Sequence, residues 1–568
     1  MRRAVLFCFG VAVLTVVGSA SAQTASATPQ AMPTAPQVTP APLPQPVAQQ
    51  PARPVMNLKI EDAVQRALER NLDIAVERLN PQTFDLSIAG LEANYRPTFN
   101  YSMSYRDANQ YTTSQTAGAD ILNTVSLTGN TGLSQNFRWG GGNATLSWNN
   151  SRIANSNQFA TRNPTLNAGL TASYIQPLLR NFRIDSTRAS LKVTRLNQQI
   201  SENQLKSTLT NTLSTVRNAY WDLVYAVQAV DAAQSSYDLA IRLVQDNRTR
   251  VEIGTMAPID IVQAEAEAAT RRQTLVQAQA TRRTAELVLK RLIVSGTEDD
   301  AWKSELNPVD RPAFHPTPID VDAAVRRALE QRTDVAQAKE QISINDVQVK
   351  LLTDQTLPAL DLTASYGVAG IGGTQYVRSG LGGSITEVIP SGFGRALTSL
   401  SAPTWNVALN FSYPIGTSSA EATLGRAKVQ VQQAQAQIKQ IELQIATEVT
   451  NAALTVQSNA ERVQAASVAR ELAQKRLEAE NSKFEVGMST NYFVVQAQRD
   501  LADAQNTELR AIADYNKSLV EFERVQQTSL SRANITLVSG GGGGTTTTTS
   551  SSSQTTTTTG TTRTGGGQ

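Results

Sequence analysis

Two glycine-centred segments repeat far apart in this chain, and they constrain its fold more than any other feature. "VEIGTMAPIDIVQAE" begins at Val251, and "FEVGMSTNYFVVQAQ" begins at Phe484. Another matching pair precedes them in the same order: "EDAVQRALERNLD" at 61–73 and "DAAVRRALEQRTD" at 322–334. Ordered duplication of this kind usually produces two structurally equivalent halves. The expected boundaries are 58–300 for a first repeat, 301–318 for a connector and 319–530 for a second repeat.

The glycines separate very long helical segments. Residues 184–250 contain neither Pro nor Gly, and 417–482 contain only Gly425 as an interruption. Small apolar residues recur there at three- and four-residue spacing, which is typical of helices that pack laterally with one wet face. Since Gly can end a helix in the left-handed conformation, we predict that each half forms a helical hairpin that turns at Gly254 or Gly487. Thr255, Ser489 and Thr490 are candidate N-caps for the return helices.

Four shorter segments alternate between apolar and polar residues. "TFNYSMSY" places Phe99 and Tyr101 on one face and Asn100 on the other, and "WNVALNFSY" shows the same pattern in the second half. Strict alternation predicts strands with one apolar face. An opposite face of Ser, Thr, Asn and Gly suits a water-filled lumen, as in a lipid-embedded barrel. A half-buried sheet in a soluble domain is the alternative. The predicted strands are 97–107, 165–176, 358–367 and 404–414.

Four strands cannot close a barrel, because about eight is the smallest useful number. Open strand edges in lipid would leave amides unpaired, so several copies must share one barrel. The first repeat carries an additional segment that is expected to form one more hairpin around Gly140–Gly142. Whether that hairpin joins the barrel or projects from it stays open at this stage.

The ends of the chain predict export and flexible tails. Arg2 and Arg3, an apolar run and Ala20-Ser21-Ala22 indicate a signal peptide over 1–22, with an uncleaved anchor as the alternative. A Pro-, Ala- and Gln-rich linker is expected over 23–57, and a disordered Gly-, Thr- and Ser-rich tail over 531–568.

Residue counts exclude most chemistry. The single Cys, Cys8, lies in the predicted signal, and His315 is the only His. Cys-ligated metals, poly-His sites and His-based triads are therefore excluded, and we expect neither an enzyme nor a cofactor. The net charge of +3 is small and dispersed, so nucleic acid is not an expected partner.

The two glycine turns, "SYIQPLLRNF" (173–182), "SYPIG" near Tyr413 and "RALERNLDI" (66–74) resemble TolC-type outer-membrane efflux proteins over about 58–527. The resemblance implies an α+β membrane protein, a homotrimer whose 12-stranded β-barrel takes four strands per chain and continues as an α-helical tunnel. It also implies an outer-membrane location of a Gram-negative type, with the tunnel in the periplasm. The implied function is a passive exit duct of a tripartite efflux or type I secretion system. Its partners would be a periplasmic adaptor and, indirectly, an inner-membrane transporter. A periplasmic coiled-coil scaffold or adhesin-like protein is the alternative.

The resemblance also assigns candidate functional residues. Family members dock the adaptor at the two helical tips, although these positions could equally be tight turns only. The tip residues are Ile253, Gly254, Thr255, Val486, Gly487 and Met488.

Family members often narrow the tunnel with acidic rings near the tips. This chain has Phe493 and Gln496 at those second-half positions, and Asp260 and Gln263 at the first-half equivalents. In some members this first-half Asp, here Asp260, is locked by bonds to an Arg and a Tyr of the second half. The matching positions here are Ser489 and Phe484, neither of which can form the ion pair, and Phe484 has no hydroxyl. We therefore expect a constriction built from Phe493 or Gln496, or one held by helix packing. Ordinary interhelical packing is the alternative role for Phe493.

Overall fold

The computed structural model describes residues 54–113, 120–311, 314–316, 318–380, 383–416 and 418–530, together with the backbone of 531–532, 535–538 and 546–549. The predicted signal peptide and nearly all of the predicted linker lie outside these residues. None of the helices described combines the length and the apolar composition needed to cross a membrane.

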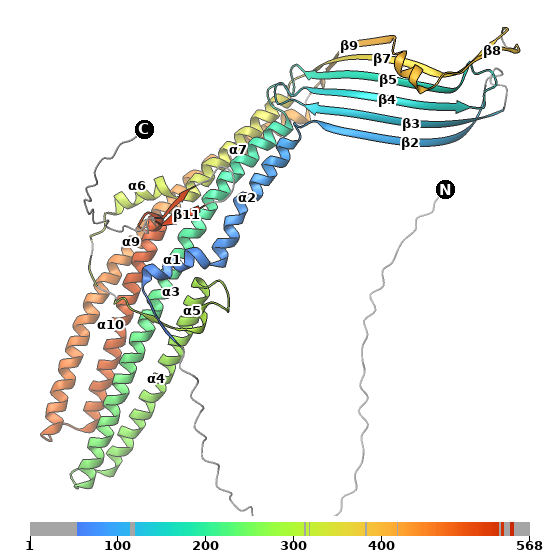
Figure 1. The fold of residues 1–568 in the computed structure, drawn as a ribbon. Helices are drawn as coiled ribbons and strands as arrows, with labels where there is room; N and C mark the ends of the chain where they lie inside the picture. The colour runs from blue at the N-terminus through green and yellow to red at the C-terminus, as the bar shows by residue number, and fades with distance from the viewer. Residues whose placement is uncertain are drawn as a thin grey trace, which may run out of the picture. The chain divides into compact units, whose positions relative to one another are not determined.

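Two long helical hairpins dominate the structure (Figure 1). The first consists of α3 (Ser186–Glu252) and α4 (Pro258–Ile293), and the second of α9 (Ser419–Glu485) and α10 (Asn491–Val525). Helices α3 and α10 also pack on each other, which joins the two hairpins side by side. The long segments without Pro explain these helices, since nothing interrupts their backbone hydrogen bonds.

A short helix followed by a longer one precedes the sheet in each half. In the first half these are α1 (Ile60–Arg70) and α2 (Leu72–Ala93), and in the second α6 (Val321–Gln331) and α7 (Thr333–Gln355). The Asn71 side chain accepts hydrogen bonds from the backbone N–H groups of Asp73 and Ile74, which caps α2. Helix α2 packs on α3, and α7 packs on α3 and α9, so four helices lead toward the sheet.

The remaining helical and short strand elements lie around these helices. Strand β1 (Val55–Leu58) pairs in parallel with β6 (Glu305–Pro308), next to α5 (Asp300–Lys303). The expected linker therefore ends in a strand, and the expected connector carries a helix and a strand. Helix α11 spans Ser529–Arg532, and β10 (Ile535–Val538) pairs with β11 (Thr546–Thr549). These short elements lie at the start of the tail predicted to be disordered, and the rest of the tail lies outside the described residues.

One antiparallel sheet contains all of the long strands. Its order is β2-β3-β4-β5-β7. Strand β9 pairs with the half of β7 nearer the long helices, and the short β8 pairs with the end of β7 farther from them. The strands are β2 (Thr98–Tyr111), β3 (Ile121–Asn136), β4 (Asn143–Asn155), β5 (Arg162–Pro177), β7 (Ala359–Arg378), β8 (Ile385–Ile389) and β9 (Ala402–Ser412). Strands β2, β5, β7 and β9 occupy the four segments for which alternation predicts strands.

The prediction of four strands per chain is wrong, because β3 and β4 add two full-length strands to the same sheet. They form the hairpin around Gly140–Gly142 and lie between β2 and β5. Each pairs along nearly its whole length with both neighbours, so the hairpin is part of the sheet and does not project from it. The sheet therefore has six long strands.

A short helix, α8 (Phe393–Thr398), packs across β5 and β7 at the end of the sheet far from the long helices. Ala396 is fully buried there against Leu166 and Ala168. Gly370 permits this contact, because a Cβ at that position would lie 2.0 Å from the Ala396 carbonyl oxygen.

Candidate site at the helical tips

Both helical hairpins turn through a glycine in the left-handed conformation. Gly254 has φ of 78° and Gly487 has φ of 77°. The backbone N–H groups that follow, of Thr255 and Met488, donate to the carbonyl oxygens of Arg250 and Lys483 at 2.9 and 2.8 Å. These bonds satisfy carbonyl groups at the end of each first helix, which is the usual geometry of a glycine-terminated helix.

The tips expose large apolar side chains. Met488 is 79 % exposed, Val486 70 % and Ile253 68 %. Side chains this exposed contribute little to the packing of their own hairpin in a single copy.

The hydroxyl groups near the tips do not cap the return helices as predicted. Thr255 Oγ1 donates back to the Arg250 carbonyl oxygen at 2.9 Å, and Ser489 Oγ donates to Glu480 Oε2 at 2.8 Å. Thr490 occupies the N-cap position of α10 without a side-chain hydrogen bond. Both hydroxyls therefore reinforce the end of the first helix, and α4 begins at Pro258, whose missing N–H suits a first turn.

The two tips are held against each other. Asn247 of α3 donates through Nδ2 to Asn491 Oδ1 of α10 at 3.1 Å, and Asn491 donates to the Asp260 carbonyl oxygen at 3.4 Å. Leu243, Phe484 and Val494 form a buried cluster beside these amides. Phe484, at a position where the family can place a locking tyrosine, is therefore a core residue that joins the two hairpins.

The four constriction candidates do not form one cluster. Gln263 and Gln496 line a hollow of about 260 Å³ between α4 and α10. Phe493 is 51 % exposed and packs edge-to-face on Tyr492, with ring centroids 5.6 Å apart. Asp260 touches the second hairpin through its backbone carbonyl, and its carboxylate forms no ion pair among the residues described.

An ion pair with a buried carboxylate lines the same hollow, and it was not predicted from the sequence. Glu267 of α4 is 4 % exposed and receives a hydrogen bond from Arg271 Nε at 2.8 Å. Arg499 of α10 donates from Nε to the other Glu267 oxygen at 3.0 Å and also binds it through Nη2. Burial acts to raise the pKa of Glu267, but the hydrogen bonds and charges of Arg499 and Arg271 outweigh it and lower that pKa.

This ion pair connects the two hairpins within one copy, close to the tips. Arg476 and Asp500 form a comparable pair at 2.7 Å, but both lie in the second hairpin. Separating α4 from α10 breaks the Glu267–Arg499 contact and leaves the Arg476–Asp500 contact intact.

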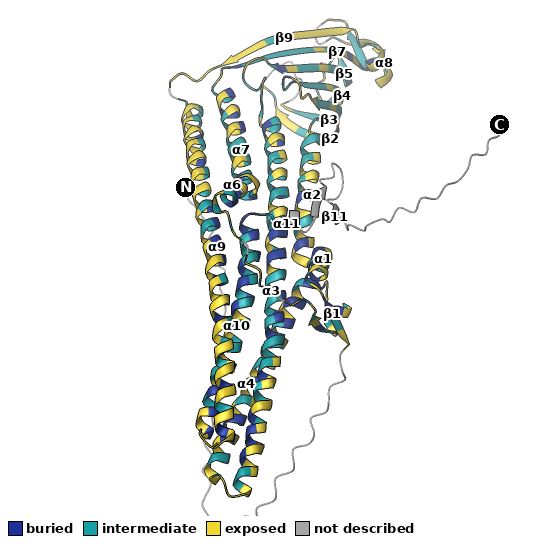
Figure 2. Cartoon of the chain, turned by 90° about the vertical axis from the view of Figure 1, so that its left-hand side faces the viewer, coloured by how far each residue is buried: buried dark blue, intermediate teal, exposed yellow. Residues whose placement is uncertain are grey.

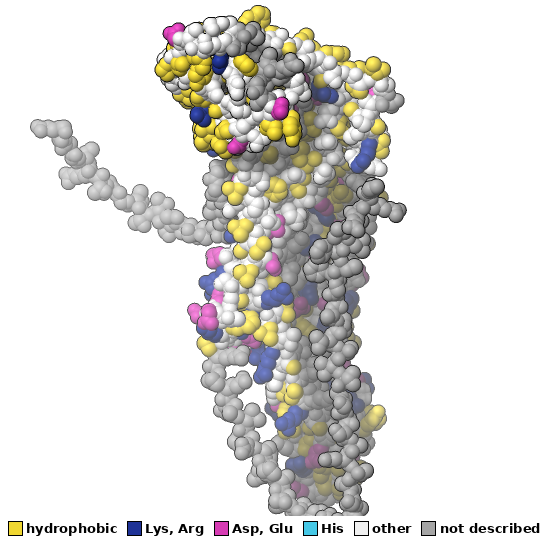
Figure 3. Space-filling model, turned by 90° about the vertical axis from the view of Figure 1, so that its right-hand side faces the viewer, with side chains coloured by type: hydrophobic (Ala, Val, Ile, Leu, Met, Phe, Trp, Pro, Cys, Tyr) yellow, Lys and Arg dark blue, Asp and Glu magenta, His cyan; other side chains and the backbone are white. Residues whose placement is uncertain are grey.

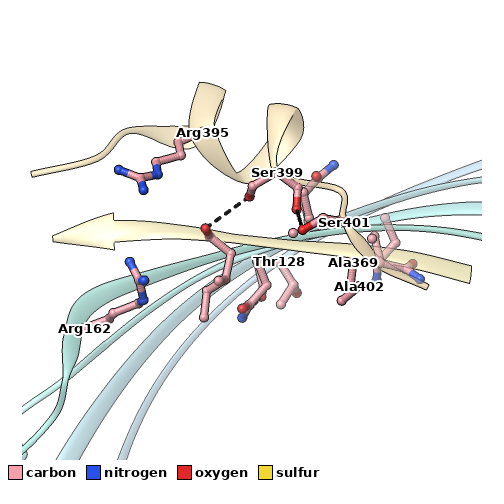
Figure 4. Close-up of a pocket in the computed structure, with 16 residues that line it drawn as sticks. Thr128, Arg162, Ala369, Arg395, Ser399, Ser401 and Ala402 are labelled. Atoms are coloured by element: carbon pink, nitrogen blue, oxygen red, sulfur yellow. Dashed lines mark hydrogen bonds between the residues drawn. The ribbon is translucent and has the colours of Figure 1, made fainter. Parts of the chain in front are cut away.

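The sheet carries a second polar surface. Thr128, Asn149, Ser151 and Asn167 lie on one face of neighbouring strands. They are among the residues around a hollow of about 670 Å³ beside α8, which Asn150, Ala168 and Gly370 of the other face also line (Figure 4). Arg162 and Arg395 border the hollow from β5 and α8. The opposite face carries the exposed aromatic and aliphatic side chains, and in Figure 3 hydrophobic side chains gather on the sheet at the top of the view.

The model of the family described as outer membrane efflux protein matches residues 63–294 and 324–525. The chain belongs to the outer membrane efflux protein family. Its members are channels and not enzymes, which agrees with the residue counts above. No curated protein sequence matches this chain.

Solved structures of outer-membrane channels share the fold of this family member. The outer-membrane channel OprN is 17 % identical, with a TM-score of 0.59, and the match covers 82 % of this chain and 89 % of that one. The Campylobacter jejuni CmeC outer membrane channel is 16 % identical, with a TM-score of 0.58 and coverage of 82 % and 85 %. VceC of Vibrio cholerae is 15 % identical, with a TM-score of 0.58 and coverage of 82 % and 96 %.

Proposed function

We propose that this chain forms the outer-membrane exit duct of a tripartite efflux or type I secretion system. Three copies share one barrel, and their helical hairpins continue it as a tunnel into the periplasm. The duct conducts substrate passively, and an inner-membrane transporter supplies the energy through a periplasmic adaptor.

The observation that carries the proposal is the sheet. One face is aromatic and aliphatic yet exposed, the other is polar, and both edges lack a partner in a single copy. Such a sheet is stable in lipid only when other copies close it. Membership of the outer membrane efflux family supports the same conclusion.

Within this function, the exposed tips dock the adaptor through Ile253, Val486 and Met488. Gln263, Gln496 and Phe493 narrow the tunnel, and the Glu267–Arg499 pair holds the hairpins in the closed arrangement. The position of the pair between α4 and α10 supports this closure, because it joins the first hairpin to the second.

The proposal is tested by fractionation and crosslinking of the full chain. The expected protein enters the outer membrane and runs as a heat-labile trimer after detergent extraction. A photoreactive residue at position 488 should capture a periplasmic adaptor, whereas one at Leu443 of α9, which is also largely exposed in a single copy, should not. A water-soluble monomer obtained without detergent would refute the proposal.

A further inference from the structure

The two edges of the sheet differ from its interior in a way that indicates missing neighbours. Nearly every residue of β2 and β9 is exposed, on both faces, whereas β3, β4, β5 and β7 are mostly half-buried (Figure 2). On their apolar faces, β2 exposes Phe99 and Tyr105, and β9 exposes Trp405 and Phe411. Unpaired edges that carry aromatic side chains need a partner strand, especially in lipid.

The direction of the edge strands makes them suitable partners for each other. Every neighbouring pair in the sheet is antiparallel, so β2 runs away from the long helices and β9 runs back toward them. When β2 of one copy lies next to β9 of another, the alternation continues without a break. The β3–β4 hairpin preserves this property because it adds strands in a pair.

We propose that β2 of each copy pairs with β9 of the next, and that three copies with six long strands each close an eighteen-stranded barrel. The number of copies rests on the trimer of the proposed function. The number of strands per copy comes from the sheet itself. The resulting barrel has one and a half times as many strands as one built from four strands per copy.

The register of the sheet gives this barrel an ordinary geometry. One row of paired residues crosses all six strands: Phe99, Leu133, Leu146, Ala172, Tyr366 and Trp405. Phe99 lies one residue from the helix-side end of β2, and Trp405 lies seven residues from the helix-side end of β9. If the helix-side end of β9 lies level with the helix-side end of β2 of the next copy, the row shifts by six residues along the strand direction on crossing one copy. This is a stagger of one residue per strand.

A stagger of one residue per strand sets the strand tilt. With a rise of about 3.3 Å per residue and a strand spacing of about 4.8 Å, the tilt is roughly 35°, which is within the range of membrane barrels. At that tilt the backbone radius is about 17 Å for eighteen strands and about 11 Å for twelve. The added hairpin therefore widens the lumen substantially.

The turn of the β3–β4 hairpin is fixed to the helix ends, which supports its place in the wall. Arg138 forms an ion pair with Glu92 of α2 at 2.8 Å. Gln176 Nε2 donates to the Gly140 carbonyl oxygen at 2.8 Å, and Arg188 Nη1 donates to that of Arg138 at 3.3 Å. A loosely attached surface insertion would not need contacts with three separate elements.

Cysteine crosslinking tests the pairing, because the only native Cys lies in the predicted signal. Tyr105 and Trp405 lie seven residues from the helix-side ends of their strands, so Tyr105→Cys with Trp405→Cys should give disulfide-linked trimers. The matched control is Phe99→Cys with Trp405→Cys, whose positions are offset by six residues, or about 20 Å. Linked trimers from the control alone, or from neither variant, would refute the proposed register.

Thiol modification in planar bilayers tests the strand number. Ser147 of β4 lies on the polar face, opposite Thr171 of β5, and Trp148 lies on the apolar face. A charged thiol reagent should reduce single-channel conductance of Ser147→Cys in up to three steps, one per copy, and leave Trp148→Cys unchanged. Thr171→Cys is the positive control, because β5 lines the lumen with either strand number.

The outcomes separate this inference from the proposed function. If Thr171→Cys responds and Ser147→Cys does not, the hairpin lies outside the wall and the eighteen-stranded barrel is refuted, while the duct remains. If neither a trimer nor a conducting channel forms, the proposed function fails first.

Discussion

The ion pair between Glu267 and Arg499 provides a direct test of closure at the tips. Among the described residues, Arg499 makes the one ionic contact to Glu267 that comes from the second hairpin, and replacing it with Ala removes that contact. Arg499 is half-exposed, and Glu267 keeps Arg271, so solvent screening limits the loss to about 1 kcal/mol per copy. If three copies open together, the sum is about 3 kcal/mol, which corresponds to a roughly 150-fold shift toward the open state.

Single-channel recording of purified trimers in planar bilayers measures this shift as the ratio of open to closed time. Arg476→Ala is the matched control, because Arg476 is about as exposed as Arg499 but its ion pair, with the more exposed Asp500, lies within one hairpin. Glu267→Gln should shift opening by a similar amount, about 1 kcal/mol per copy, since it removes the same ion pair with Arg499, whereas its contact with Arg271 lies within α4 and is common to the open and closed states. Equal open times for Arg499→Ala, Arg476→Ala and the parent chain would show that the pair does not hold the tips closed.

Four further outcomes are expected. Asp260→Ala should change closed-state conductance only modestly, because its carboxylate has no ionic partner among the described residues; a large leak in the same recordings would identify it as a main latch. Since the folded-state pKa of Glu267 is lowered, its contribution is present at neutral pH and lost as the pH falls through that pKa, so channels should open only in acid, at a pH below the ordinary glutamate pKa. Glu267→Gln should lack this response to acid. Gly487→Ala should cost about 1–2 kcal/mol through its positive φ alone, since no atom crowds the added methyl, and hydrogen exchange around the turn should speed up. Tyr220→Phe should lower stability by about 1–2 kcal/mol, because the buried hydroxyl donates to Asp310 at 2.7 Å; denaturant unfolding measures it, with the half-exposed Tyr237→Phe as control.

The long hairpins and four of the strands could be predicted because their patterns are local. A run of more than sixty residues without Pro permits few folds other than helix, and strict alternation permits few other than strand. Strands β3 and β4 were harder to detect, since Gly129, Asn150 and Arg152 interrupt the apolar face. Their place in the sheet becomes evident only from their pairing with β2 and β5 in the structure.

The site could be predicted less well than the fold. The tip positions follow from the glycines, but the Glu267–Arg499 pair joins residues 232 positions apart in sequence. Its formation depends on the rotation of two helices about their own axes, which spacing along one helix does not determine. An acidic residue among the buried positions Ala264, Ala268 and Leu275 of α4 was the available signal, because a buried carboxylate requires a partner.

The anchored turn between β3 and β4 has a consequence for how such ducts can diversify. The hairpin begins and ends at the sheet and has no long helix of its own beneath it. Gaining or losing this hairpin changes the diameter of the barrel, while the helical tunnel keeps the same number of helices. The helical tunnel would then set the size limit on the cargo, and the diameter of the barrel could vary with its surroundings at the cell surface.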